Sequence, residues 1–189
     1  MTSYLRQGGA GRLGDGAILT WTVAEGARGR RWRAMATVAG VISHVLLLEV
    51  DLTGRLTRIE LSTAGGLLTL HPSVDGATLH GNRVSPIGIE HLRFDWGPDH
   101  GLSIDGRPIA DAVTARRLTS AVHVGEHRSV SVVAVAPDLT LREESITFGA
   151  VDFGLWHVTS SIGDQIVRLD DRGILVGLAD SVEWALEAD

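Results

Sequence analysis

The sequence predicts a mainly β fold, a single-domain antiparallel β-roll or flattened barrel with one short helix, and three observations favour this class. Short segments rich in Val, Ile, Leu, Thr and Trp are separated by Gly and Asp at intervals of roughly ten residues, which is typical of a sandwich, roll or barrel. The 189 residues are 44% hydrophobic, which suits one core of ordinary size. A helical pattern of apolar and small residues is limited to one short stretch, 109–118.

The first sixteen residues are rich in glycine and are expected to form a flexible arm, because they have little apolar surface to bury. The arm contains Gly9-x-Gly11-x-x-Gly14, a formal match to the dinucleotide-binding fingerprint. That fingerprint follows a strand and opens a helix, and neither is expected here. We therefore predict no nucleotide site, and place a single β-roll domain over 17–189.

Strands are expected where apolar and polar residues alternate, or where apolar runs lie between turn residues. Gly54 and the pairs Asp75-Gly76 and Asp105-Gly106 predict three hairpin turns, and Pro86 favours an extended chain before it. The almost wholly apolar run 131–136 is expected to be covered on both faces. The expected strands are 18–23, 31–38, 41–50, 55–61, 67–70, 77–80, 87–96, 102–104, 122–124, 129–135, 139–142, 145–148, 155–159, 165–169 and 174–178, with a strand or helical turn at 181–188.

Composition removes several kinds of chemistry. The chain has no cysteine, and all 17 of its basic residues are arginine. Zinc–thiolate sites, iron–sulfur clusters, cysteine nucleophiles and lysine Schiff bases are thereby excluded. A nucleophile-elbow motif, Gly-x-Ser-x-Gly, is also absent. We expect no cofactor, no metal and no catalytic residue.

Charge and hydropathy bear on partners and location. The net charge of −6 argues against a nucleic-acid binder, which needs a basic surface. The one basic cluster, Arg28, Arg30, Arg31 and Arg33 around Trp32, is interpreted as a solvated strand face. The start of the chain does not resemble a signal peptide, and the longest apolar run, 41–50, is too short to span a bilayer. We expect a cytoplasmic protein with no transmembrane segment.

Two segments, 50–56 and 169–175, share an apolar-Asp-x-x-Gly-x-Leu hairpin, one in each half of the chain. Asp and Gly at such spacing recur by chance in β proteins, so the similarity is a weak indication of a duplicated half.

The second half of the chain contains Arg116-Arg117-Leu118, a turn at Gly125, an apolar strand with Pro-x-Leu at its end over 130–141, and a final hairpin at 169–175. These segments resemble the Arg-Arg-Leu, Gly turn, apolar strand and final hairpin of the glycolipid-binding domain family, of which the chain looks like a divergent member. The family's Cys and its Asn-Thr-Leu-Pro-Ile segment are missing. The resemblance implies a β-roll likened to bacterial lipoprotein carriers, and binding of a glycolipid.

Two groups of titratable residues have spacings that could serve catalysis. His123-Val124-Gly125-Glu126-His127 formally matches an inverted zincin motif, but the central Gly and the flanking strands predict a turn. His91, Asp95, Asp99 and His100 surround Trp96. On a loop they could hold a divalent metal or form an acid–base pair, or they could be a solvated loop.

Arginine and tryptophan are the candidate ligand contacts. Adjacent residues of a strand point to opposite faces, so one of Arg116 and Arg117 is expected to face the interior. There it needs an acid such as Asp111, Asp95 or Glu126, or the carboxylate or phosphate of a ligand. Most tryptophans are expected in the core, but two or three could line an open mouth.

The function predicted is non-catalytic binding of a hydrophobic or amphipathic small molecule, such as a glycolipid, on the concave face of the sheet. The predicted contacts are Arg116, Arg117, Trp21, Trp32, Trp96, His91 and Asp95. Two alternatives remain open. One is a hydrolase or isomerase that uses the loop with His91, Asp95 and His100, and the other is a protein-interaction or dimerisation module that uses exposed sheet edges.

Overall fold

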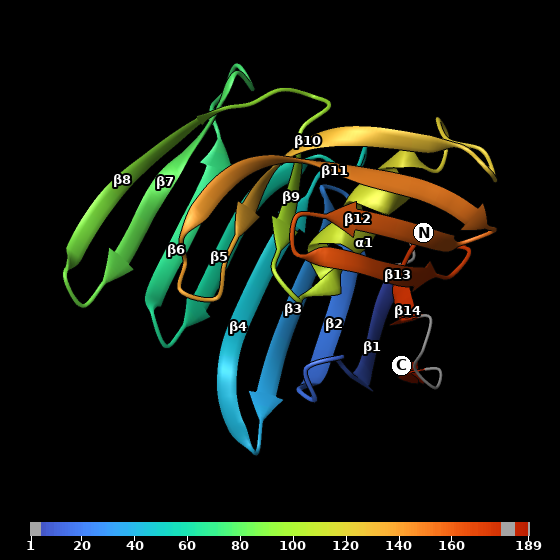
Figure 1. The fold of residues 1–189 in the computed structure, drawn as a ribbon, viewed down its shortest axis with the longest axis horizontal. Coiled ribbons are helices and arrows are strands. Elements are labelled where there is room, and N and C mark those ends of the chain that lie inside the picture. Colours follow the sequence, from blue (N-terminus) through green and yellow to red (C-terminus); the bar gives the residue numbers. More distant parts are fainter. Residues whose placement is uncertain (1–4, 179–183, 189) are drawn as a thin grey trace.

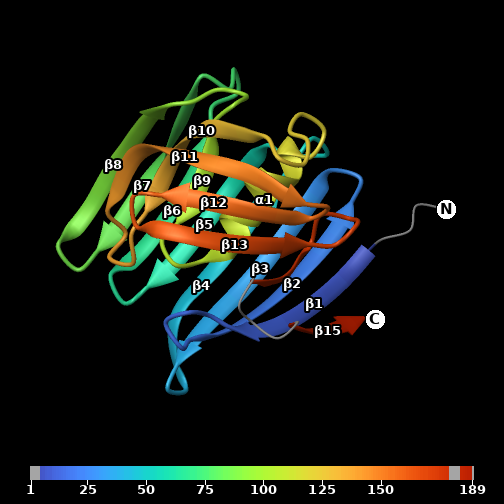
Figure 2. The same ribbon diagram turned by 45° about the vertical axis from the view of Figure 1, so that its right-hand side comes forward.

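The computed structural model describes residues 5–178 and 184–188, and consists of two curled sheets with one helix between them (Figures 1 and 2). Strands make up 63% of the chain and helix 6%. The predicted class, a mainly β roll with one short helix, is confirmed.

The larger sheet has nine strands in the order β15-β1-β2-β3-β4-β5-β6-β7-β8, and every neighbouring pair is antiparallel. Hairpins therefore join β1 to β8 in sequence, and the C-terminal strand adds to the β1 edge. The strands are β1 Leu5–Arg12, β2 Ile18–Gly26, β3 Gly29–Val38, β4 Val41–Val50, β5 Leu56–Thr63, β6 Gly66–Pro72, β7 Thr78–Ser85, β8 Gly88–Asp95 and β15 Ala185–Ala188.

The smaller sheet has six strands in the order β14-β13-β12-β11-β10-β9. Its strands are β9 Gly101–Ile104, β10 His127–Val135, β11 Leu141–Asp152, β12 Leu155–Ser160, β13 Gly163–Leu169 and β14 Leu175–Leu178. β9 and β10 are parallel, and the helix α1, Pro108–Leu118, lies in the connection between them. The helix expected over 109–118 is confirmed.

Period-2 alternation explains the core. Along β2 and β3 every second side chain is buried, so one face of the large sheet packs inward and the other faces solvent. Trp21 and Trp32 are 2% and 1% exposed, and their ring centroids lie 5.4 Å apart. The predicted coverage of the 131–136 run holds for its residues 132–135, all of which are buried.

The expected flexible arm is wrong for residues 5–12, which form β1 between β2 and β15. Glycines allow this packing: a Cβ at Gly9 would lie 2.7 Å from the Trp21 ring, and one at Gly11 would lie 2.2 Å from the Trp184 ring. Two aromatic rings thus cover a strand that has little apolar surface of its own.

Three further expectations need correction. Residues 122–124 are not a strand, and the two strands expected over 139–148 are one continuous strand, β11. Asp105-Gly106 does not close a hairpin, because α1 follows it. Of the segment expected at 181–188, residues 185–188 form β15, whereas 181–183 lie outside the described residues.

Strands β7 and β8 extend beyond the smaller sheet (Figures 1 and 2). Accordingly, no residue of β8 is buried. No helix in the described ranges has the length and apolar character needed to cross a membrane.

Candidate functional site

The C-terminal turn of α1 lies against two similar hairpin turns, one from each sheet. An added Cβ at Gly54, in the β4–β5 turn, would lie 3.6 Å from Nη1 of Arg116. An added Cβ at Gly173, in the β13–β14 turn, would lie 2.4 Å from Cγ of the same arginine. Both glycines have positive φ, +82° and +70°, which side chains rarely adopt.

The two turns are the segments that share the apolar-Asp-x-x-Gly pattern. In each turn the aspartate accepts hydrogen bonds from the backbone N–H groups two and four residues later. Asp51 Oδ1 accepts the backbone N–H groups of Thr53 and Arg55, at 2.8 and 3.0 Å. Asp170 Oδ1 accepts those of Arg172 and Ile174, at 3.0 and 2.8 Å. Partial burial raises the pKa of Asp51, but these hydrogen bonds, with one from the Thr53 hydroxyl, hold it below its usual value.

Arg116 and Arg30 converge on one carbonyl oxygen of the second turn. Arg116 Nε donates to the Arg172 carbonyl at 3.1 Å, and Arg30 Nη1 donates to it at 2.7 Å. Arg30 also pairs with Glu25 at 2.7 Å and is 7% exposed, so the solvated interpretation of the basic cluster is wrong for this residue. Burial and the charge of Arg30 lower the pKa of Arg116, and Glu25 opposes them.

Arg117 holds the loop that follows β8. Its guanidinium donates to the carbonyls of Pro98, His100 and Asp99, at 3.0, 2.7 and 3.2 Å. The expectation that an acid such as Asp111, Asp95 or Glu126 would pair with a buried arginine is therefore wrong for Arg117. The expected strand geometry is also wrong, because both arginines lie in the last turn of a helix, whose free carbonyl groups favour cations.

A cavity of about 400 Å³ opens beside this turn, and we call it the α1 cleft. Its apolar side includes Trp156 on β12 and Phe153 in the β11–β12 turn, the latter 79% exposed. Its polar side includes Arg116 and the second hairpin turn. The cavity has the size of a small-molecule site, but most of its lining residues are polar and include both Asp170 and Asp171 as well as Arg172.

A second hollow, of about 370 Å³, lies over β1 to β4 and includes Met35, Val45 and Arg33 in its lining. Trp21 borders it, but the Trp21 and Trp32 side chains belong to the core. These two predicted ligand contacts are thus buried under the sheet, as are the other inward-facing side chains of β2 and β3.

The structure separates two members of the candidate His/Asp group. His91 and Asp95 lie on one exposed face of β8, about 13 Å apart along the strand because four residues separate them. His91 Nδ1 is 2.6 Å from Asn82 Oδ1. His100 instead packs against half-buried Trp96, with ring centroids 5.5 Å apart.

The predicted turn at 123–127 is confirmed. Gly125 has φ +88°, and Glu126 accepts the backbone N–H of His123 at 2.9 Å. In the described part of the chain, no three His, Asp or Glu side chains are grouped to hold a metal ion.

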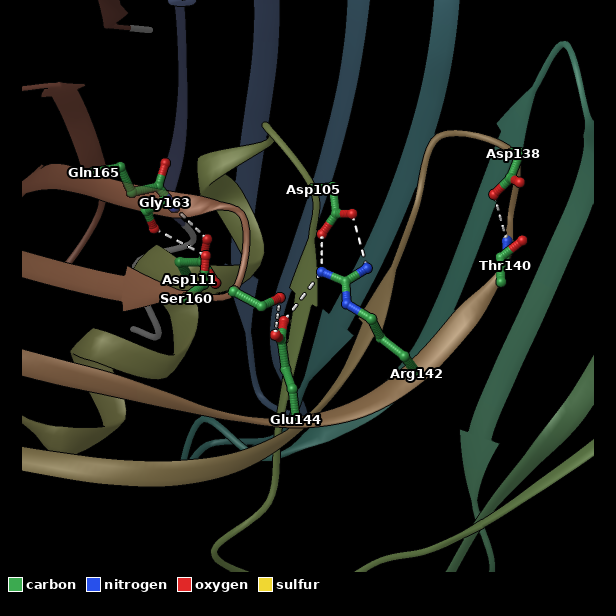
Figure 3. A network of polar contacts seen from close by, with 10 residues as sticks. Asp105, Asp111, Asp138, Thr140, Arg142, Glu144, Ser160, Gly163 and Gln165 are labelled. Atoms are coloured by element: carbon green, nitrogen blue, oxygen red, sulfur yellow. Dashed lines mark hydrogen bonds and ion pairs between the residues drawn. The ribbon is translucent and has the colours of Figure 1, made fainter.

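The N-terminal turn of α1 carries a buried carboxyl group that the sequence interpretation did not single out as a site (Figure 3). Asp111 is 2% exposed and accepts a hydrogen bond from Gln165 Nε2 at 2.5 Å. Burial raises the pKa of Asp111 to about 7, although hydrogen bonds from Ser103 and Gln165 oppose it. Nearby, Arg142 donates to both carboxylate oxygens of Asp105, at 2.8 and 2.7 Å.

Comparisons with known proteins address the fold alone. No family model matches the chain, and no curated protein matches its sequence. Among solved structures, it is similar to the 1.80 Å crystal structure of a DUF1089 family protein from Pseudomonas aeruginosa, with a TM-score of 0.52 and 18% identity. The match covers 96% of this chain and 92% of that one. At this identity the similarity supports the architecture and not a function.

Proposed function

We propose that the protein binds an amphipathic small molecule in the α1 cleft, with Arg116 holding an anionic head group. A single observation supports this proposal: in the described ranges Arg116 forms no ion pair with a carboxylate, and it borders the same cavity as the exposed side chain of Phe153. A guanidinium group favours a carboxylate or phosphate. An exposed aromatic ring favours an apolar chain or a sugar face.

The inward side chains of β2 and β3 are buried, so the proposed site is the cleft and not the concave face expected from sequence. The resemblance to the glycolipid-binding family makes a glycolipid one candidate ligand. An oligomer formed through sheet edges and a cytoplasmic location stay predictions.

The test compares three amphiphiles that share a decyl chain, namely decanoate, a decyl glycoside and a decyl trimethylammonium salt, each below its micelle concentration. Tryptophan fluorescence should change on binding, because Trp156 borders the cleft. We expect decanoate to bind most tightly and the cation least. Equal affinities for all three would contradict a role for Arg116.

Two variants separate the halves of the site. Arg116→Gln should weaken decanoate binding about tenfold and leave the glycoside unchanged, since it removes one charge-assisted contact. Phe153→Ser should weaken both by about tenfold, because less apolar surface is buried. Arg33→Gln, which removes the same charge on another face, is the control and should change neither.

A further inference from the structure

Beside the α1 cleft lies a smaller cavity of about 220 Å³ that three arginines border. We call it the arginine pocket and define it by Arg55, Arg117 and Arg128, with Asp99. Arg117 and Thr53 border both cavities, whereas Arg55 and Arg128 border only the pocket and Arg116 only the cleft.

These arginines retain hydrogen-bond donors. Arg117 uses two N–H groups of Nη1 and one of Nη2 on loop carbonyls, which leaves its Nε–H and one Nη2–H. The Arg55 side chain makes no hydrogen bond or ion pair with any described residue. Arg128 pairs with Asp99 at 3.4 Å, and that carboxylate is 84% exposed.

The charges around the pocket do not balance. Three arginines and one carboxylate, that of Asp99, border the pocket. The charge of Arg55 also acts on Asp51 in the same hairpin turn, and the C-terminus of α1 adds a partial negative charge, so the excess around the pocket is positive but smaller than three guanidinium groups alone would give. The pKa of Arg117 responds to this imbalance: burial lowers it, Asp99 raises it, and Arg55 and Arg128 lower it again. A bound anion would relieve this repulsion.

We propose that the arginine pocket is a second ligand site, separate from the α1 cleft, that binds a phosphate group. A phosphate monoester is negatively charged at neutral pH and offers three acceptor oxygens, which match the free guanidinium donors around the pocket. The pocket is smaller than the roughly 300–1,000 Å³ typical of larger organic ligands. A compact oxyanion therefore suits its size.

The test titrates the intact protein with inorganic phosphate in a buffer of low ionic strength, followed by calorimetry and by ³¹P NMR line width. The Arg55→Gln/Arg128→Gln double variant should bind phosphate at least about tenfold more weakly, because two charge-assisted donors are lost. Arg58→Gln is the matched control: Arg58 is an exposed arginine of β5 that pairs with Glu60. Its loss should leave phosphate affinity unchanged.

Glycerol 3-phosphate distinguishes a free phosphate from a phosphorylated head group. Tighter binding of inorganic phosphate supports the first source, and tighter binding of the ester supports the second. No binding of either up to about 10 mM, or equal binding by the double variant and the unmodified protein, would overturn the proposal. Arg55 and Arg128 are exposed, so the double variant should keep its thermal midpoint.

The two proposals can fail separately. Arg116→Gln should retain phosphate binding, and the Arg55→Gln/Arg128→Gln variant should retain decanoate binding. If one change abolished both, the claim that the two sites are separate would be wrong.

Discussion

Gly173 lies in direct contact with Arg116, and it joins the β13–β14 turn to the end of α1. An added Cβ at this glycine would be 2.4 Å from Arg116 Cγ and 2.6 Å from its Cδ. The absence of a side chain at position 173 is therefore a condition for the position of the arginine in the α1 cleft.

Gly173→Ala should destabilise the protein by about 2–3 kcal/mol, because the positive φ is strained and the methyl group displaces Arg116. Gly106→Ala is a matched control: its φ is +67° and nothing lies within 4 Å of the added Cβ. It should lose only about 1 kcal/mol. Urea denaturation measures both, and equal losses would show that the contact with Arg116 has no energetic weight.

Asp111→Asn should alter how stability depends on pH. The native pKa near 7 exceeds the unfolded value, so the protonated form is favoured on folding, and this stability is present at pH 4 and lost as pH rises to about 7. Asparagine mimics the protonated acid. The free energy of unfolding of the variant, relative to that of the unmodified protein, should rise by up to about 4 kcal/mol from pH 4 to pH 8. Denaturation at each pH measures this difference. A difference that does not change with pH would contradict the raised pKa.

His44→Gln should show the opposite trend. Burial, and then the charge of Arg107, lower the pKa of His44 to about 4. Because the unfolded histidine takes up a proton near pH 6.5 and the native one does not, native stability is lost as pH falls from 6.5 to 4. The variant lacks this titration. Its free energy of unfolding relative to that of the unmodified protein should therefore rise by up to about 3 kcal/mol as the pH falls over that range. NMR titration of the His44 ring gives an independent check, and a midpoint near 6.5 would refute the explanation.

Arg142→Ala should cost about 2–4 kcal/mol, since it leaves the carboxylates of Asp105 and Glu144 without their cation. Their side chains are only 14% and 11% exposed. Arg128→Ala removes a far more exposed ion pair with Asp99, and should cost less than about 1 kcal/mol. Thermal denaturation of both variants makes the comparison, and a similar loss in each would mean that burial does not strengthen the Arg142 pair.

Local patterns predicted much of the fold. Alternating residues located most strands, and glycines placed the turns at Gly54 and Gly76 because positive φ is a property of one residue and its neighbours. The same approach failed at β1. Its own residues have little apolar surface, and the aromatic rings that cover it, Trp21 and Trp184, lie elsewhere in the chain.

The candidate site was predicted only in part. The sequence singled out Arg116 and Arg117, but their partners proved to be carbonyl oxygens in distant turns and not nearby acids. It also predicted Trp21 and Trp32 as ligand contacts, although the sheet buries them, and did not single out Phe153. No pattern identified Asp111 as a carboxyl group with a pKa near 7, because its burial depends on packing between α1 and β13.

The sequence by itself determined that the chain is mainly β, that one short helix interrupts the strands, and that two Asp-x-x-Gly segments form turns. Each of these properties arises from the conformational preferences of a few consecutive residues. Only the tertiary structure decided that both turns meet the end of α1, that Arg116 faces a cleft, and that three arginines share a pocket. These relationships join residues as far apart as Arg30 and Arg172, 142 positions along the chain. They depend on how the two sheets pack, which no local pattern encodes.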